Sequence, residues 1–116
     1  MPLQSSIQYP REGVVLAVLD GRLEYGPALQ ALKAELMPFV EKPGTTLILD
    51  LAKVLYADSA GLGALLFLNG SAKDVGASLR IATVGPRLAQ ILQITHTAPL
   101  FIVDPDVETS LAHSGR

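Results

Sequence analysis

Short apolar runs alternate along this chain with segments whose leucines recur at helical spacing. Val14–Leu19 and Thr45–Leu51 are rich in apolar and β-branched residues, as expected of central strands covered on both faces. The segment between them carries an apolar stripe at helical spacing, formed by Leu29, Leu32, Leu36 and Phe39. Strands that alternate with helices predict right-handed crossovers and a mainly parallel sheet.

The first strand is expected to run in the opposite direction to the others. Leu3–Tyr9 alternates loosely between apolar and polar residues, which is typical of an edge strand. The turn-like segment Pro10–Gly13 that follows is short, so the first two strands should pair antiparallel. A helix should then begin near Pro27 and kink or stop near Pro38.

The remaining elements complete an α/β fold in the order ββαβαβαβα. They are predicted as a helix from Ser59 to a stop at Gly76, a strand at Ser78–Val84, a short helix opened by Gly85-Pro86, a strand at Phe101–Val103, and a last helix opened by Asp104-Pro105 that runs to about His113. The result is a mostly parallel central sheet with an antiparallel edge strand and helices packed on it.

Size and composition favour one domain. With 116 residues, 49% of them hydrophobic, the chain can bury a core, and we assign residues 1–113 to one domain with a frayed tail at 114–116. Only 17% of the residues are charged, which favours a surface partly covered by a partner. The net charge of -2 and the lack of a basic stripe argue against direct nucleic-acid binding.

The sequence also predicts a cytoplasmic protein without a membrane span. It has no cysteine, which excludes disulfides and zinc–thiolate sites. The first residues lack the basic start and apolar run of a signal peptide. The longest hydrophobic run, Leu62–Leu68, is far shorter than the ~20 residues that cross a bilayer.

Two polar segments follow the central strands, and functional loops of parallel sheets gather at such carboxyl ends. Asp20–Glu24 and Tyr56–Gly63 should therefore be neighbours. The second segment places Asp58 and Ser59 where a strand gives way to a helix, whose unpaired N–H groups and partial positive charge would accept a phosphate. We therefore interpret Ser59 as a phosphorylation switch rather than a catalytic nucleophile. The alternative, that Asp58 or Ser59 is simply an N-cap, is compatible with this interpretation.

Nucleophilic catalysis, dinucleotide binding and metal binding would each need residues that the sequence does not supply in the required pattern. A Gly-x-Ser-x-Gly nucleophile elbow would need glycine where Ala57 stands, and no local pattern ties His96 or His113 to Ser59. A dinucleotide-binding fingerprint would need a third glycine where Leu66 stands. The two histidines have no third metal ligand at a suitable spacing. We therefore expect no enzyme activity, no metal and no cofactor.

The acidic residues at the strand ends are also interpreted as non-catalytic. Asp50 ends a central strand, as in phosphoacceptor receiver domains, but Asp20 stands alone and no lysine lies near Val103. We expect Asp50 to bond to loop backbone instead. Glu24 and Asp58 are expected to be solvated loop acids rather than a catalytic pair.

The residues around Ser59 resemble the signature of STAS domains, and more closely that of bacterial anti-sigma factor antagonists. The resemblance rests on Ile48-Leu49-Asp50-Leu51, on Tyr56-Ala57-Asp58-Ser59-Ala60-Gly61-Leu62-Gly63, and on Leu19-Asp20-Gly21-Arg22-Leu23-Glu24, which is similar to a family loop with the usual form Gly-Glu-Leu-Asp. The order of elements agrees over essentially the whole chain. Three positions depart from the family pattern. Ala60 replaces a second serine or threonine, Glu24 an aspartate, and Arg22 an acidic residue, which bears on partner choice.

This resemblance implies a phosphoprotein that acts in transcription regulation by partner switching. Such a protein binds an anti-sigma factor that is also a serine kinase, and thereby frees a sigma factor. The kinase then phosphorylates the serine that matches Ser59, the complex dissociates, and a serine phosphatase resets the cycle. The protein is expected to be a monomer or a weak homodimer. The partner-binding residues implied are Gly21, Arg22, Leu23, Glu24, Asp58, Ser59, Ala60, Gly61, Leu62 and Gly63.

Two hypotheses from other classes stay open. One is a STAS subunit that is not phosphorylated and docks on a lipid-transport ATPase or in a larger signalling assembly. The other is a module that binds a nucleotide or a lipid at the loops after the strands.

Overall fold

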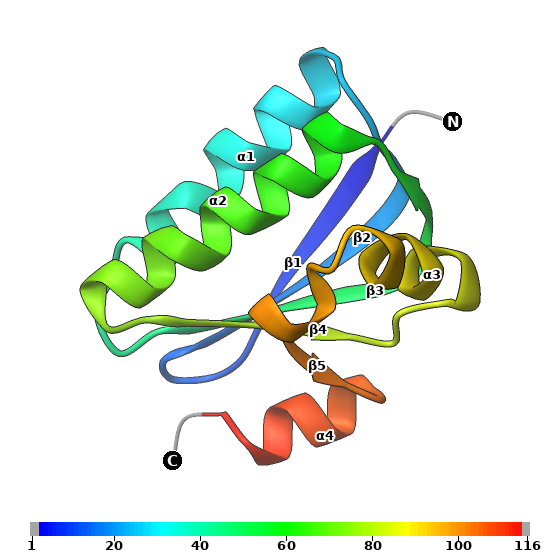
Figure 1. Cartoon of the computed structure of the whole chain (residues 1–116). Helices are drawn as coiled ribbons and strands as arrows, with labels where there is room; N and C mark the ends of the chain where they lie inside the picture. The colour runs from blue at the N-terminus through cyan, green and yellow to red at the C-terminus, as the bar shows by residue number, and fades with distance from the viewer. Residues whose placement is uncertain (1–2, 115–116) are drawn as a thin grey trace.

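The computed structural model describes residues 3–114, which form a five-stranded sheet with helices on both faces (Figure 1). The strands lie side by side in chain order. β1 pairs antiparallel with β2, and the other neighbours pair parallel, so the predicted α/β fold with an antiparallel edge strand is confirmed. The bounds are β1 Gln4–Arg11, β2 Val14–Leu23, β3 Thr46–Ala57, β4 Ser78–Ala82 and β5 Ile102–Asp104.

The described helices cover the two faces of the sheet unequally. α1 (Pro27–Val40), α2 (Ser59–Val75) and α3 (Pro86–Ile94) pack on one face, and α4 (Val107–Ala112) packs on the other (Figure 1). A short 3-10 turn, η1 (Ala98–Leu100), precedes β5. The larger core lies under α1–α3, and a smaller one under α4 contains Val14, Leu16, Ile48 and Ala82. Because β2 and β3 carry buried residues on both faces, their sequences read as near-continuous apolar runs.

The first two helices begin and end largely as the sequence predicts. α1 starts at Pro27, where the missing amide N–H leaves no helical bond unmade, but it continues two residues beyond Pro38. Its buried stripe ends on Val40, whereas Phe39 is only half-buried. α2 stops at Gly76, which adopts the left-handed conformation with φ 79°.

Both central strands run further than predicted. β2 extends through Asp20–Leu23 and β3 reaches Ala57, so most of the segments expected to be loops are paired strand. The pairing between β2 and β3 is interrupted by two register shifts. At the second one, Gly21 faces Val54 while Arg22 faces Tyr56, which leaves Leu55 as the extra residue of a bulge.

The last helix begins later than predicted. Its N-cap is Asp106, whose carboxylate accepts a hydrogen bond from the amide of Thr109 at 2.7 Å. Asp104, the predicted cap, instead ends β5 and forms an ion pair with Arg80 of β4 at 2.8 Å. The local pattern Asp-Pro cannot show this, because the partner of Asp104 lies on a neighbouring strand.

The predicted tail begins at a residue that is part of the packed structure. Ser114 is buried, and its hydroxyl donates a hydrogen bond to the carbonyl oxygen of Ser110 in α4. The expectation of a frayed end therefore does not hold for Ser114. The other two residues of that expectation, Gly115 and Arg116, lie outside the described residues.

Candidate functional site

The carboxyl ends of β2 and β3 meet in one place, as their topology predicts. Arg22 pairs with Tyr56 and Leu23 with Ala57 in the parallel register. The amide of Asp58 donates a hydrogen bond to the carbonyl oxygen of Leu23 at 3.0 Å. The two polar segments singled out in the sequence are therefore joined by the sheet itself.

Asp58 is the residue that organises this junction. One carboxylate oxygen accepts a hydrogen bond from the amide of Gly61 at 2.8 Å, which makes Asp58 the N-cap of α2. The other oxygen accepts one from the amide of Tyr25 at 2.9 Å. These two N–H donors, from Tyr25 and Gly61, hold the pKa of the Asp58 carboxyl below its usual value. Asp58 is therefore a fixed anion that ties the loop after β2 to the start of α2.

Ser59 is the first residue of α2, and its side chain is exposed. The exposed serine thus stands at the amino end of a 17-residue helix, where the macrodipole favours a negative group. With Asp58 capping the helix, the Ser59 side chain is not required as the cap.

Gly61 and Gly63 differ sharply in their surroundings. A Cβ atom at Gly61 would lie 1.9 Å from the carbonyl oxygen of Leu23, so the helix approaches the sheet more closely than any other residue type allows. A Cβ atom at Gly63 would meet nothing within 4 Å. Only the first glycine is required by packing, and it fixes the distance between α2 and the end of β2.

Most of the other candidate residues either bond to a neighbouring side chain or are buried. Arg22 and Glu24 form an exposed ion pair with an Nε–Oε1 distance of 3.2 Å. Glu24 therefore bonds to Arg22, while the carboxylate of Asp58 is occupied by backbone amides. The structure thus gives the two acids separate partners. Gly21, Leu23 and Leu62 are buried and belong to the frame of the site rather than to its surface.

Three residues near the site, Tyr25, Leu55 and Arg87, were not singled out from the sequence. Tyr25 and Leu55 are among the most exposed apolar side chains of the molecule. Arg87, at the start of α3, lies over the ring of Tyr56 on the same edge. The bulge that turns Leu55 outward and the approach of α3 to β3 depend on tertiary packing, so no local signal could have identified them.

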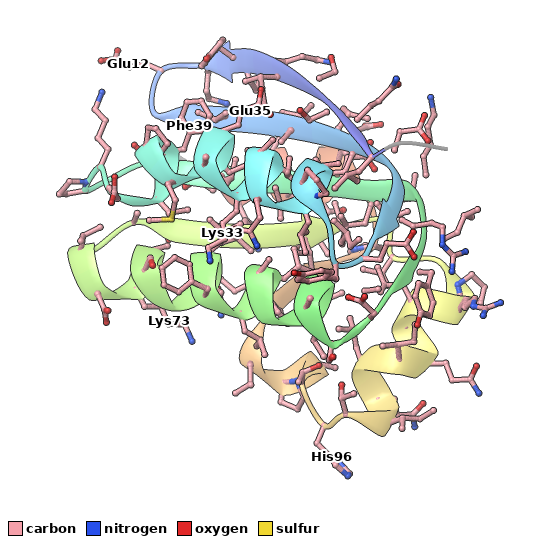
Figure 2. All side chains as sticks on the ribbon, turned by 90° about the horizontal axis from the view of Figure 1, so that it is seen from above. Glu12, Lys33, Glu35, Phe39, Lys73 and His96 are labelled. Atoms are coloured by element: carbon pink, nitrogen blue, oxygen red, sulfur yellow. The ribbon has the colours of Figure 1, made fainter. Side chains whose placement is uncertain are left out.

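The acid–base and metal hypotheses gain nothing from the structure. His96 lies at the exposed end of α3, away from the helix start of α2 (Figure 2). His113 is exposed beside α4, where its Nδ1 contacts the carbonyl oxygen of Thr109 at 2.9 Å. Asp50 accepts a hydrogen bond from the backbone amide of Ala52 at 3.1 Å, although that amide belongs to β3 and not to a loop. Within residues 3–114, no three potential ligands gather as a metal site.

In the part of the chain that the structure describes, no helix combines the length and the apolar character that a membrane crossing requires.

Comparison with known proteins gives the family from the sequence and the same fold among solved structures. The STAS domain family model matches residues 10–110. A protein of Bordetella bronchiseptica, BtrV, which is provisionally named an anti-sigma factor antagonist, is 29% identical over 101 residues. That alignment covers 87% of this chain and 86% of the relative.

Three solved structures illustrate the range of proteins that share the fold. The anti-sigma factor antagonist SpoIIAA in its unphosphorylated form has a TM-score of 0.79 at 17% identity, with 95% of each chain covered. SpoIIAA, a Bacillus cell fate determinant, is also known in a phosphorylated form, with a TM-score of 0.74 at 17% identity over 95% of this chain and 98% of that one. A sulfate transporter family protein from Wolinella succinogenes has a TM-score of 0.77 at 20% identity, covering 91% and 88%.

Proposed function

The chain belongs to the STAS domain family, and from this membership we propose that it is an anti-sigma factor antagonist switched by phosphorylation of Ser59. In this proposal the unmodified protein binds an anti-sigma factor that is also a serine kinase, and so releases a sigma factor in the cytoplasm. Phosphorylation ends the binding, and a serine phosphatase restores it. The protein itself binds and is modified, and it catalyses no reaction.

The observation that carries this proposal is the exposed side chain of Ser59 at the capped start of α2. A kinase can reach it without unfolding the protein, since the cap is supplied by Asp58 and the close packing by Gly61. The name of the relative BtrV and the two solved forms of SpoIIAA, unphosphorylated and phosphorylated, support a phosphorylation-switched antagonist role for the chain.

The chemistry of the step is a simple phosphoryl transfer. The hydroxyl oxygen of Ser59 attacks the γ-phosphorus of ATP, the bond to the bridging oxygen breaks, and ADP leaves. The hydroxyl proton passes to a base of the kinase. The product carries about −1.5 to −2 charges at neutral pH.

The phosphate would affect the free and the bound protein differently. In the free protein it is hydrated and lies at a helix start, which stabilises it by about 0.3–1 kcal/mol. In an interface it would lose water beside the fixed anion Asp58, and desolvation of an unpaired ion costs several kcal/mol. Because each 1.4 kcal/mol changes affinity about tenfold, phosphorylation should release the partner.

Phosphorylation by an anti-sigma factor kinase tests the proposal directly. Incubation with such a kinase and ATP should add one phosphate, located at Ser59 by peptide mass spectrometry, and Ser59→Ala should abolish it. Ser71→Ala, in the same helix, is the matched control and should be phosphorylated like the wild type. A phosphate on another residue would contradict the assignment of Ser59.

The second candidate function is a subunit that docks on a transporter without being phosphorylated. It is favoured by the fold shared with the sulfate transporter family protein. In that case Ser59→Ala and Ser59→Glu should both support normal function, and the protein should purify together with a transporter component.

A further inference from the structure

A positively charged, aromatic patch lies at the same edge of the sheet as Ser59. Arg22 of β2 and Arg87 of α3 both approach the ring of Tyr56 of β3, with guanidinium carbons 4.5 Å and 5.7 Å from its centroid. Three elements that are distant in sequence therefore build one patch, which we call the arginine patch and define as Arg22, Tyr56 and Arg87.

Both guanidinium groups keep donors free for another molecule. Arg22 uses its Nε in the ion pair with Glu24, and its side chain is still 45% exposed. Arg87 is exposed, and among residues 3–114 it has no ion pair. Because a guanidinium group carries five N–H donors in a planar fork, each arginine can still bind a carboxylate. Stacking on Tyr56 reduces the freedom of both side chains and prepares them for binding.

Exposed apolar side chains accompany the arginine patch. Leu55, the extra residue of the β3 bulge, is 65% exposed, and Tyr25 is 81% exposed. A shallow hollow of about 380 Å³, lined by Tyr25, Gly26, Pro27 and Gln30, adjoins the loop that Asp58 holds. Arginine and tyrosine beside exposed apolar groups are the residues in which the binding energy of protein interfaces concentrates.

We propose that the arginine patch binds an acidic segment of a partner protein, whose carboxylates pair with Arg22 and Arg87 and whose apolar residues contact Leu55 and Tyr25. This inference rests on the proposed function, because it names the chemistry of the surface that recognises the partner. Discrete carboxylates fit better than a nucleic-acid backbone. Glu24 is ion-paired with Arg22, the carboxylate of Asp58 follows Tyr56 by two residues, and the whole chain carries a net charge of -2.

The patch also gives phosphorylation a second way to weaken binding. Ser59 follows Tyr56 by three residues and lies at the same end of β3, so its phosphate brings negative charge to the surface that carries the two arginines. A phosphate there competes with the carboxylates of the partner for these cations, in addition to the desolvation it suffers.

A peptide titration tests the inference without any kinase. The probe is an acetylated, amidated hexapeptide of alternating glutamate and leucine, and its neutral analogue has glutamine in place of glutamate. Backbone and arginine side-chain NMR signals of the full-length protein are followed during titration. The acidic peptide should shift the signals of Arg22, Tyr56 and Arg87, and the neutral analogue should shift them at least tenfold less at equal concentration.

Substitutions then assign the effect to the two arginines. The double variant Arg22→Gln/Arg87→Gln should weaken binding of the acidic peptide at least tenfold, whereas Lys42→Gln, an exposed cation at the other end of the sheet, should leave it unchanged. All three side chains are exposed, so the spectra should otherwise match the wild type. Equal binding by the double variant or by the neutral analogue would overturn the inference. Binding to vesicles containing phosphatidylserine without a response to the peptide would do the same.

The outcome separates this inference from the proposed function. If no anti-sigma factor kinase modifies Ser59 but the acidic peptide binds at the arginine patch, the proposed function fails and the inference about the arginine patch stands. If a kinase binds and phosphorylates Ser59 with the same affinity for wild type and for Arg22→Glu/Arg87→Glu, the proposed function stands and this inference fails.

Discussion

Gly61 shows how a single missing side chain sets the geometry of the site. The start of α2 lies against the carbonyl oxygen of Leu23, and this approach brings the Asp58 cap, the end of β2 and Ser59 into one unit. In the sequence Gly61 and Gly63 look alike. The structure distinguishes them, because only one of the two has a neighbour where its Cβ would be.

The first prediction compares these two glycines. Gly61→Ala should lower the free energy of unfolding by about 3 kcal/mol, since the new methyl group meets backbone that cannot move aside. Gly63→Ala, in open space on the same helix, should be neutral or stabilise the protein by up to ~1 kcal/mol through helix propensity. Urea denaturation of both variants measures the difference, and equal effects would show that the close approach at Gly61 is absent.

The second prediction concerns the charge at position 59 in the free protein. Because Ser59 is exposed at a helix start, Ser59→Glu should change the free energy of unfolding by no more than about 0.5–1 kcal/mol, and in the stabilising direction. Thermal denaturation measures it, and the NMR spectrum should change only near the substitution. A large loss of stability would mean that phosphorylation acts by unfolding the site rather than by charge in the interface.

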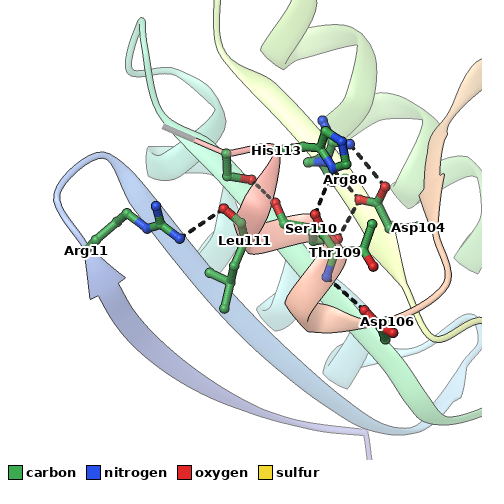
Figure 3. A network of polar contacts seen from close by, with 9 residues as sticks. Arg11, Arg80, Asp104, Asp106, Thr109, Ser110, Leu111 and His113 are labelled. Carbon is green, nitrogen blue, oxygen red and sulfur yellow. Dashed lines mark hydrogen bonds and ion pairs between the residues drawn. The ribbon is translucent and has the colours of Figure 1, made fainter. Parts of the chain in front are cut away.

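At the scale of elements, α4 is too short to be stable alone and is held by polar contacts (Figure 3). Asp104 accepts two hydrogen bonds from the guanidinium group of Arg80, at 2.8 and 3.0 Å, and one from the hydroxyl of Ser110 in the helix. Arg11 donates a further bond to the carbonyl oxygen of Leu111 at 2.9 Å. The helix is thus fastened to β4, β5 and the end of β1.

The third prediction tests how much the ion pair of Asp104 contributes to stability. Arg80, helped by Ser110, lowers the pKa of the buried Asp104 carboxyl. Asp104→Asn should lower the free energy of unfolding at pH 7 by about 2 kcal/mol, because a partly buried arginine loses its charged partner. Asp106→Asn is the control, since asparagine caps a helix as well as aspartate does and little change is expected.

The same pair should make the stability depend on pH in a defined direction. A carboxyl whose pKa is lower in the folded protein contributes stability above its unfolded pKa and loses it as the pH falls through the folded value. The difference in the free energy of unfolding between wild type and Asp104→Asn should therefore be at its largest at pH 6 and shrink below about pH 4. Urea denaturation at a series of pH values measures it. A difference that grows in acid would contradict the assignment.

For the whole molecule, the important feature is the uneven cover of the sheet. The face under α1, α2 and α3 holds most of the core, whereas the opposite face depends on α4 to cover a small apolar group (Figure 1). Val107 and Leu111 are the α4 side chains that pack on this group. Ser59 lies on the side of the sheet that holds the larger core, because its helix, α2, packs there.

The fourth prediction concerns a chain from which α4 has been removed. A chain truncated after Asp106 should expose the apolar group under α4 and bind the dye 1-anilinonaphthalene-8-sulfonate, which marks exposed apolar surface. It should also unfold at a lower temperature than a chain that lacks only residues 115–116. Light scattering should show self-association of the shorter chain. A monomer that excludes the dye would show that this face needs no helix.

Much of the architecture was predictable because it follows from local chemistry. The apolar runs of β2 and β3, the leucine stripe of α1, the helix start at Pro27 and the helix stop at Gly76 determine the alternation of strands and helices. Parallel connection then places the ends of β2 and β3 together, so the neighbourhood of Arg22 and Ser59 followed from topology alone. The exposed position of Ser59 at a helix start was also contained in the sequence.

Other features were decided only by the tertiary structure, because they depend on residues far apart in the chain. The Asp104–Arg80 pair replaced a local N-cap, and the bulge at Leu55 arose from the registry of two strands. The arginine patch needs α3 to return to the end of β3. A sequence encodes local conformation through each residue and its near neighbours, whereas long-range charge pairs and strand registers exist only once the core has packed.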